Sequence, residues 1–427
     1  MLALLLACAP TTLPLNPDRS ERPPLGDTDT DDTGSDDTGE PEDTDTDTAL
    51  AADAAWTVLV YMVGDNDLEE YVTHDLNELE AGGPGGAVRV LVLADRAEGY
   101  DDADGDWTGT RLYEVLGDEK INEVTSPVLA DWGEADMADP ETLARFLAYA
   151  AEAAPAEQYA LVLWNHGSGW YADGQPPPGI GWDESSEDDL SIAEGELTAG
   201  LEAFTAAHGP FDLVAFDACN MAFFEVAHAL REHARTLVAA QTWVGYDGLQ
   251  YTPALAALQA APTMDSAALG DLMARDPVEI SGELTFSATD LGQLDDVAAA
   301  LDTMAGVALD TPASWEAMVA AHAAARGVEP GEGDGWRREY MDLRDLAAQA
   351  AAGSDPALAA AGADLVNAVN AAMIGNHKVS DFAWAGGMNI YADTMFATFY
   401  STADGATWSQ ATRWDEVLLR LAVESGD

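Results

Sequence analysis

From Trp56 onward, short hydrophobic runs alternate with amphipathic stretches along the chain. Runs rich in Val and Leu occur at 56–63, 88–95, 159–166, 211–218 and 237–244. Because they are nearly continuous, they are typical of strands that are covered on both faces of a sheet. The stretches between them repeat apolar residues every three or four positions, which is typical of helices. These helices are expected at 68–82, 140–154, 194–209 and 222–234. This order predicts an α/β sandwich around a mostly parallel sheet.

Beyond about residue 265 the sequence becomes rich in Ala, a strong helix former, and predicts a helix-rich C-terminal region. The expected helices lie at 295–309, 314–325 and 355–375. Strand-like pieces at 282–290 and 385–393 interrupt them. These pieces fit either edge strands of the same sheet or a second small domain. We therefore expect a core over 54–265 and a helix-rich region over 266–427, whose extra strands complete or flank the core.

The chain is strongly acidic: its 427 residues carry a formal net charge of -61. Binding to nucleic acid or to an anionic bilayer through a basic face is excluded, because such binding depends on Lys and Arg. With 48% hydrophobic residues, the chain as a whole is globular. The global acidity fits either a solvation strategy or the attraction of basic substrates.

The first 53 residues differ from the rest of the chain. Residues 1–8, MLALLLAC, resemble a bacterial lipoprotein signal that ends at a lipidated Cys8. Residues 9–53 are expected to form a disordered acidic linker, because their Asp/Thr-rich run has no aliphatic side chains to bury. This layout predicts an outer-membrane or cell-surface lipoprotein that contacts the membrane only through its lipid anchor. A disordered hydrophobic N-terminus is the alternative.

Reactive side chains follow two of the predicted strands. His166 ends the run at 159–166, and Cys219 comes directly after the run at 211–218. If the two strands are parallel neighbours, the intervening segment leaves room for one crossover helix, at 194–208. The carboxyl ends of parallel strands meet at one edge of the sheet, where ligands bind. Cys219 and His166 are therefore expected to face each other there.

Each position has a chemical rationale. A helix beginning near Asn220 would favour the Cys219 thiolate through its positive end. His166 would polarise a scissile carbonyl and protonate a leaving amine. Gly167 allows close approach of a substrate, and the N–H groups of Gly167 and Cys219 could hold an oxyanion. A buried structural cysteine remains the alternative, and spacing alone does not decide between them.

The order of five segments resembles the clostripain family of cysteine peptidases, which have the caspase-like fold. These segments are WTVLVYMVGDNDLE, NHGSGW, GIGWDESSEDDLSIAEGEL, FDLVAFDACNMAFFEVA and QTWVGYDGLQY. The resemblance covers roughly residues 56 to 255, with weaker matches at EYMDLRDL and GGMNIYAD. It implies that 54–265 is a peptidase core, that Cys219 is the nucleophile and that His166 is the catalytic histidine. It further implies that protein or peptide substrates with basic residues are the partners.

Specificity residues also follow from the resemblance. Members cleave after Arg or Lys by means of acidic residues in the first pocket, and Asp217 and Asp247 match such positions. Paired carboxylates suit a guanidinium because it accepts planar, bidentate partners. Asp217 could instead cap a helix, and Asp247 could be a turn residue before Gly248.

The sequence departs from the family between the two reactive residues. Members are typically activated by cleavage after a basic residue in this interval, yet residues 167–218 contain no Lys or Arg. Either no such cut is needed or it falls elsewhere, after Lys120 or Arg231. The chemistry requires no cofactor and no metal site is predicted. Some members of the family depend on calcium, so calcium binding by this chain is left as an open alternative. The acids Asp183, Glu184, Glu187, Asp188 and Asp189 lack the spacing of a known calcium loop and favour solvated charge.

The sequence therefore predicts a cysteine endopeptidase that cleaves after Arg, with Lys as the second candidate. The alternative is a catalytically silent, surface-displayed binding protein with the same fold. An α/β hydrolase with serine chemistry is disfavoured, because no G-x-S-x-G elbow follows a strand.

Overall fold

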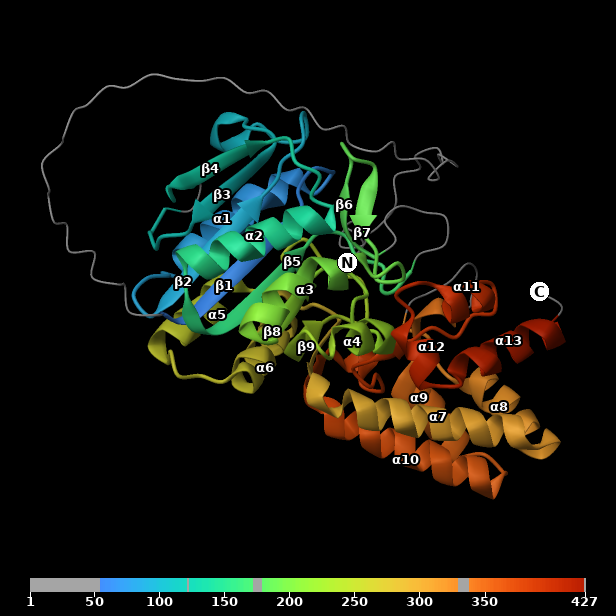
Figure 1. The fold of residues 1–427 in the computed structure, drawn as a ribbon. Coiled ribbons are helices and arrows are strands. Elements are labelled where there is room, and N and C mark those ends of the chain that lie inside the picture. Colours follow the sequence, from blue (N-terminus) through green and yellow to red (C-terminus); the bar gives the residue numbers. More distant parts are fainter. Residues whose placement is uncertain (1–53, 121–122, 172–178, 329–337, 426–427) are drawn as a thin grey trace, which may run out of the picture.

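The computed structural model describes residues 54–120, 123–171, 179–328 and 338–425 (Figure 1). The expected lipoprotein signal at 1–8 and acidic linker at 9–53 lie outside the described residues. None of the described helices is both long and apolar enough to cross a membrane.

A nine-stranded sheet lies at the centre of the fold, in the order β12-β10-β9-β8-β5-β1-β2-β3-β4 (Figure 1). The five central strands, from β9 to β2, run parallel. The remaining strands add to both edges in antiparallel pairs. The mostly parallel sheet predicted from the hydrophobic runs is confirmed. Its strands are β1 (Ala54–Met62), β2 (Val88–Ala94), β3 (Thr110–Glu114), β4 (Val128–Gly133), β5 (Ala156–Trp164), β8 (Phe211–Asp217), β9 (Ala234–Ala239), β10 (Thr285–Asp290) and β12 (Met373–Lys378).

Small two-stranded sheets accompany the large one. The hairpin of β6 (Ile180–Asp183) and β7 (Asp188–Leu190) lies between β5 and β8 in the sequence. The other pairs β11 (Met341–Asp342) with β13 (Asn389–Ile390). The two strand-like C-terminal pieces thus belong to different sheets. The piece at 282–290 contains β10 of the large sheet, and the piece at 385–393 contains β13 of a two-stranded sheet.

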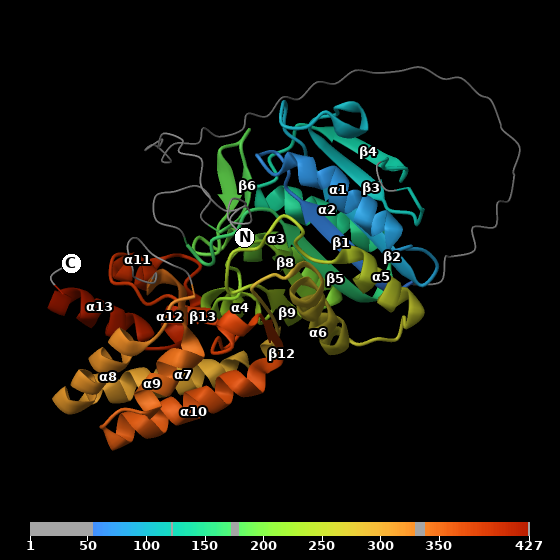
Figure 2. The same ribbon diagram turned by 180° about the vertical axis from the view of Figure 1, so that it is seen from behind.

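Helices cover both faces of the large sheet (Figures 1 and 2). Alternate residues of β1 enter different hydrophobic cores: Val58 and Val60 contact the side of α1, α5 and α6, whereas Leu59 and Tyr61 contact the side of α2 and α3. This alternation explains why the predicted strands have no polar face. The helices of these layers are α1 (Glu69–Ala81), α2 (Pro140–Ala153), α3 (Glu196–His208), α4 (Phe224–Leu230), α5 (Tyr251–Ala260) and α6 (Ser266–Asp276).

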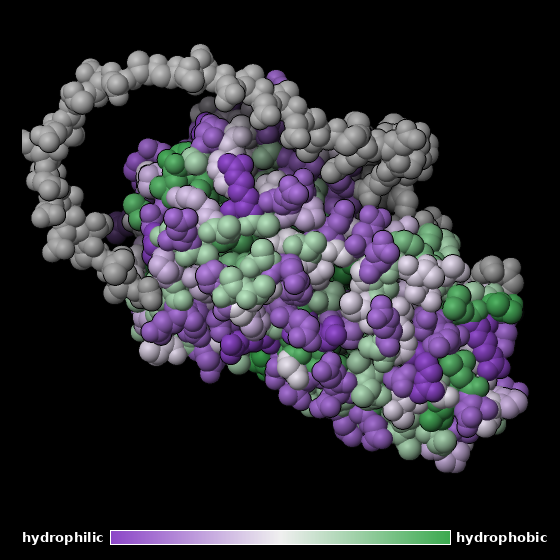
Figure 3. All heavy atoms as spheres, viewed as in Figure 1, coloured by the Kyte–Doolittle hydropathy of each residue, from purple (hydrophilic) through white to green (hydrophobic). Residues whose placement is uncertain are grey.

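The C-terminal part is helix-rich, as predicted, and packs beside α4 at one end of the sheet (Figure 2). Hydrophilic residues cover much of the face seen in Figure 3, with small hydrophobic patches between them. The helices of this part are α7 (Leu294–Asp310), α8 (Pro312–Ala324), α9 (Leu343–Ala351), α10 (Pro356–Ala372), α11 (Ala397–Thr402), α12 (Thr407–Ala411) and α13 (Trp414–Ser425), and the short turns are η1 (Ala103–Gly105), η2 (Pro277–Ser281), η3 (Leu291–Gln293), η4 (Arg338–Tyr340) and η5 (Ser380–Phe382).

Two predicted boundaries beside Cys219 are wrong. The helix expected near Asn220 begins only at Phe224, and the strand expected to reach residue 244 ends at Ala239. The two misassigned segments pair with each other: Asn220 N–H donates to the Thr242 carbonyl at 3.0 Å. Ala222 N–H also donates to the Ala240 carbonyl at 2.9 Å. These hydrogen bonds between the two segments take the place of the first helical turn and of the end of the strand.

Candidate active site

A small cavity, partly open to solvent, lies at the carboxyl edge of the sheet. His166, from the loop after β5, and Cys219, from the loop after β8, both line it. The two strands are parallel neighbours, with Trp164 in register with Asp217. The expectation that the sheet brings His166 and Cys219 to one edge is therefore met.

Gly167 allows the two loops to touch. A Cβ atom at this position would lie 2.5 Å from the Cys219 carbonyl oxygen and 3.0 Å from Met221 Cγ, so any larger residue would push the loops apart. In the described part of the chain, the Gly167 N–H makes no backbone hydrogen bond. Glycine here is a packing requirement in addition to the role in substrate approach expected from the sequence.

Cys219 is buried, with 2% of its surface exposed. The Val244 N–H donates to Cys219 Sγ at 3.2 Å. The predicted helix dipole does not act at this sulfur, because α4 begins five positions later. The N–H of Val244, in the loop after β9, contacts the sulfur where the helix end was expected.

His166 has an acidic partner that the sequence did not reveal. His166 Nε2 lies 2.8 Å from Oδ1 of Asp67, in the loop between β1 and α1. The hydrogen bond with His166 lowers the pKa of Asp67. This contact orients the imidazole ring and leaves Nδ1 for other contacts. Asp67 comes from 99 residues away, so no spacing rule in the sequence could indicate the pair.

Two buried carboxylates lie at the inner end of the cavity. Asp75 accepts a hydrogen bond from Trp164 Nε1 at 2.6 Å. Asp217 accepts one from the Tyr251 hydroxyl at 2.8 Å and one from the Leu249 N–H at 3.0 Å. Burial, reinforced by the charge of Asp75, raises the pKa of Asp217 to about 8. Asp217 does not cap a helix, so that alternative is wrong, and Asp75 is an acid that sequence reasoning missed.

Asp247 lies at the rim of the cavity. Its side chain is exposed, while its neighbours Tyr246 and Gly248 line the cavity. The Tyr246 ring stacks on Tyr71, with centroids 4.6 Å apart. Gly248 packs directly against the Asp217 carboxylate, since a Cβ atom at position 248 would lie 2.3 Å from Asp217 Oδ1. The two predicted specificity acids thus differ in depth: one is buried under the loop and the other is solvated at its edge.

Comparison with known proteins places this arrangement in a family. The model of the clostripain family matches residues 60–420. The chain belongs to the clostripain family. A curated relative, clostripain of Hathewaya histolytica, is 30% identical over 212 residues, which are 46% of this chain and 40% of the relative. The match therefore spans less than half the length of that clostripain.

Solved structures of other members have the same fold. A secreted C11 cysteine protease from Bacteroides thetaiotaomicron, in complex with an irreversible peptide inhibitor, is 20% identical, with a TM-score of 0.64 over 84% of this chain and 99% of its own. An inactive zymogen C11 protease from Parabacteroides distasonis is 19% identical, with a TM-score of 0.61 over 85% of this chain and 99% of its own. The caspase-like α/β sandwich expected for the clostripain family is confirmed.

The basic residues considered for self-cleavage in this family member differ in accessibility. Lys120 is exposed and pairs with Glu123 at 2.9 Å. Arg231 is half-buried, and its guanidinium donates to the His228 carbonyl at 2.6 Å. Lys120 is therefore the more accessible of the two residues.

Proposed function

We propose that this clostripain-family chain is a cysteine endopeptidase that cleaves after Arg, with Lys as the second accepted residue. The observation that carries the proposal is that His166 and Cys219 border one cavity whose inner end holds Asp75 and Asp217. A nucleophile and a proton-transfer group then stand beside a pocket lined by two carboxyl groups. Peptides with a basic residue are the substrates that this combination fits.

The proposed reaction follows from these positions. The Cys219 thiolate attacks the carbonyl carbon of the scissile bond, and the carbonyl oxygen becomes an oxyanion that the N–H groups of Cys219 and Gly167 stabilise. The tetrahedral intermediate expels the amine, which takes a proton from His166. Water, deprotonated by His166, then hydrolyses the thioester. Asp67 accepts the Nε2–H of His166, so Nδ1 is the nitrogen that takes up and releases the transferred proton.

The buried acids support the choice of Arg over a neutral residue. A guanidinium that enters the cavity would meet Asp217, whose pKa burial holds at about 8 in the empty site. An opposite charge at contact distance favours the carboxylate, so binding of Arg would release the proton of Asp217. Asp247, at the rim, would add a weaker attraction that salt screens.

The test compares cleavage of fluorogenic peptides that end in Arg, Lys or Asp and are otherwise identical, with a thiol reductant present. The full chain should cleave the Arg peptide fastest, the Lys peptide more slowly and the Asp peptide not at all. Cys219→Ala should cleave none of them. If neither the Arg nor the Lys peptide is cleaved, with or without calcium, the chain is not such a peptidase, and the surface-displayed binding protein becomes the better description.

We also propose that the chain acts outside the cytoplasm as a lipoprotein. Support comes from the MLALLLAC run and from the neighbour described as secreted. When the full chain is expressed in a bacterium fed a radioactive fatty acid, label should attach to the wild type and not to Cys8→Ser. Equal labelling of both would contradict lipidation at Cys8.

A further inference from the structure

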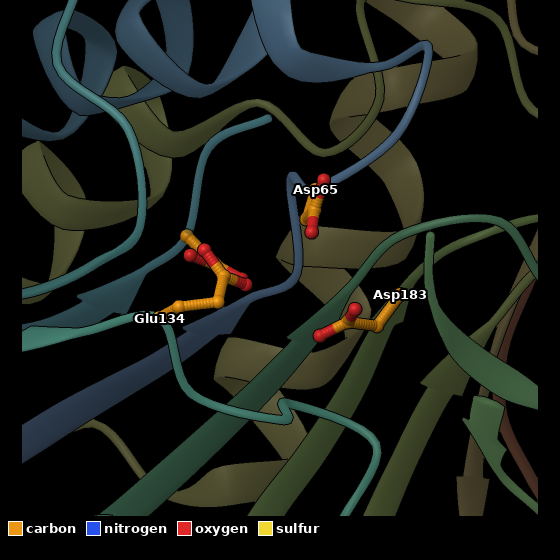
Figure 4. Close-up of side chains that lie close together, drawn as sticks. Asp65, Glu134 and Asp183 are labelled. Carbon is orange, nitrogen blue, oxygen red and sulfur yellow. The ribbon is translucent and has the colours of Figure 1, made fainter. Parts of the chain in front are cut away.

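A second group of carboxylates lies at the carboxyl edge of the sheet, away from the cavity. We call Asp65, Asp95, Glu134 and Asp183 the acidic cluster. Figure 4 labels Asp65, Glu134 and Asp183. One carboxylate oxygen from each residue lies within 4.8 Å of those of the other three. The residues follow or end β1, β2, β4 and β6, respectively. The fold thus gathers four acids that are far apart in the sequence.

Three of the four residues of the acidic cluster are buried, Glu134 is exposed, and the cluster has no basic partner among the described residues. The relative exposure is 4% for Asp65 and 0% for both Asp95 and Asp183. Within the described ranges, none of the four forms a salt bridge. Arg96, the residue after Asp95, turns away, and its Nε donates to Glu69 at 2.5 Å. Burying charged carboxylates without a counterion costs free energy. A bound cation would therefore stabilise this arrangement.

One carboxylate oxygen of the acidic cluster has no hydrogen-bond partner among the described residues. Asp95 Oδ2 is fully buried and makes no hydrogen bond among the described residues. Its other oxygen is fixed by the Thr110 hydroxyl at 3.0 Å. The N–H groups of Met137 and Ser186 likewise fix Asp183, at 3.0 and 2.9 Å. Neutral donors hold the carboxylates in place, and none of them neutralises the charge.

The electrostatics agree with this geometry. Burial, reinforced by the charges of Glu134, Asp183 and Asp65, raises the pKa of Asp95 to about 9. Burial and the charge of Asp65 raise the pKa of Glu134 to about 7. A divalent ion would remove this mutual repulsion and restore the charged carboxylates.

We propose that the acidic cluster binds a calcium ion. All four donors are carboxylate oxygens, which exclude the nitrogen and sulfur ligands typical of zinc. Calcium accepts six to eight oxygen ligands in flexible geometry, whereas magnesium keeps most of its water and uses one or two carboxylates. Four carboxylates around one point therefore suit calcium better than magnesium. Of the acids at 183–189 considered from the sequence, only Asp183 belongs to the acidic cluster.

The bound ion would act on the active site through a loop. Asp65 lies two positions before Asp67, the partner of His166. The Asp65 carbonyl also accepts a hydrogen bond from the Glu184 N–H at 2.8 Å. An ion held by Asp65 and Asp183 would tie the loop after β1 to the β6–β7 hairpin. The acidic cluster is thus a positioning site, which fixes Asp67 and through it the imidazole.

Calorimetric titration of the full-length Cys219→Ala chain with calcium chloride tests the site without any need for activity. We expect one ion per chain, at least about tenfold weaker binding of magnesium, and a rise in melting temperature of about 3 °C at saturation. Asp95→Asn and Glu134→Gln should each weaken calcium binding by about tenfold or more. Glu134 is exposed, so Glu134→Gln should fold normally, and a loss of calcium binding in this variant cannot be attributed to misfolding.

The matched control is Glu187→Gln, which removes one exposed acid from the same hairpin and should leave binding unchanged. Absence of a saturable calcium site in the Cys219→Ala chain would overturn the proposal, as would equal losses in Glu134→Gln and Glu187→Gln. Because the readouts are binding and melting, failure of the proposed peptidase activity would not alter them. If the wild type is active, removal of calcium should lower kcat more than it raises KM, since the ion orients His166 rather than the substrate.

Discussion

The inner end of the cavity and the acidic cluster both bury carboxylates at the same edge of the sheet, but they satisfy them differently. In the cavity, Asp75 and Asp217 accept hydrogen bonds from Trp164 Nε1 and the Tyr251 hydroxyl. In the acidic cluster, Asp95 Oδ2 has no donor within the described residues. The same residue type is thus partnered in one region and left open in the other.

This difference indicates what each region can receive. The cavity acids keep their hydrogen bonds when a guanidinium arrives, so they add charge without needing to reorganise. The acids of the acidic cluster face one another and leave an oxygen open, which suits an ion that needs several ligands at once. A count of acidic residues could not have separated the two regions, whereas their hydrogen-bond donors do.

The largest expected effect is on the cavity side. His166→Ala should lower kcat/KM for the Arg peptide by about 10²–10⁴-fold, because the leaving amine loses its proton donor. The same variant should bind calcium as the wild type does. His208→Ala, at an exposed helical position, is the control and should change neither quantity. Calcium binding lost together with activity would show that the two regions are not separable in the way described.

Next in size is the loss of a buried charge in the cavity. Asp217→Asn keeps the shape of the side chain but removes the carboxylate. The ratio of kcat/KM for Arg to that for norleucine peptides should fall by about tenfold or more. In the wild type this ratio should rise as the pH increases through about 8, to which burial raises the pKa of Asp217, and in the variant it should not. An unchanged ratio would assign the preference to other acids.

Another buried carboxylate, Glu225 of α4, lies outside both regions and tests the cost of burying such a group. It accepts a hydrogen bond from the Tyr400 hydroxyl at 2.8 Å. Burial raises its pKa from 4.5 to about 7. The folded state therefore holds the proton more tightly than the unfolded state, and the stability that this provides is present below pH 4.5 and is lost as the pH rises through 7.

Between pH 5 and pH 8, Glu225→Gln should therefore lose about 2–3 kcal/mol less of its free energy of unfolding than the wild type does. Urea denaturation at each pH measures the difference. Equal losses in both proteins would mean that Glu225 is ionised in the fold at pH 5, contrary to the pKa expected from its burial.

The smallest effect is expected at the rim. Asp247→Asn should lower kcat/KM for the Arg peptide by only about 2–5-fold, because exposed charge pairs are weak. Added salt should produce a similar loss in the wild type and little further loss in the variant. A loss of more than about 50-fold would transfer the main specificity role from Asp217 to Asp247.

The sequence predicted the placement of His166 and Cys219 because that placement depends on a local pattern. Each residue follows a hydrophobic run, and parallel strands bring such positions to one edge. The surroundings of Cys219 were predicted less well. The expected helix at Asn220 was wrong because its N–H bonds to Thr242, and no helical periodicity could reveal that competing partner.

The contacts that the sequence missed all join distant segments. Asp67 reaches His166 across 99 positions, and Asp183 reaches the Met137 N–H across 46. Neither pair has a spacing that a motif could record. The five acids at 183–189 stood out only because they are adjacent in the sequence, while the acidic cluster takes one of them and draws the rest from other strand ends.

The antiparallel addition of β10 and β12 has a practical consequence for anyone who shortens the chain. β10 pairs with β9 from Thr236 to Ala239, so the outer side of β9 is closed by a strand that comes from beyond residue 265. A fragment that stops at that point would keep every cavity residue, from Leu68 to Gly248, but would leave the outer backbone groups of β9 without hydrogen-bond partners. Unpaired strand edges recruit other chains. Such a fragment would precipitate as an intermolecular sheet before its chemistry could be measured.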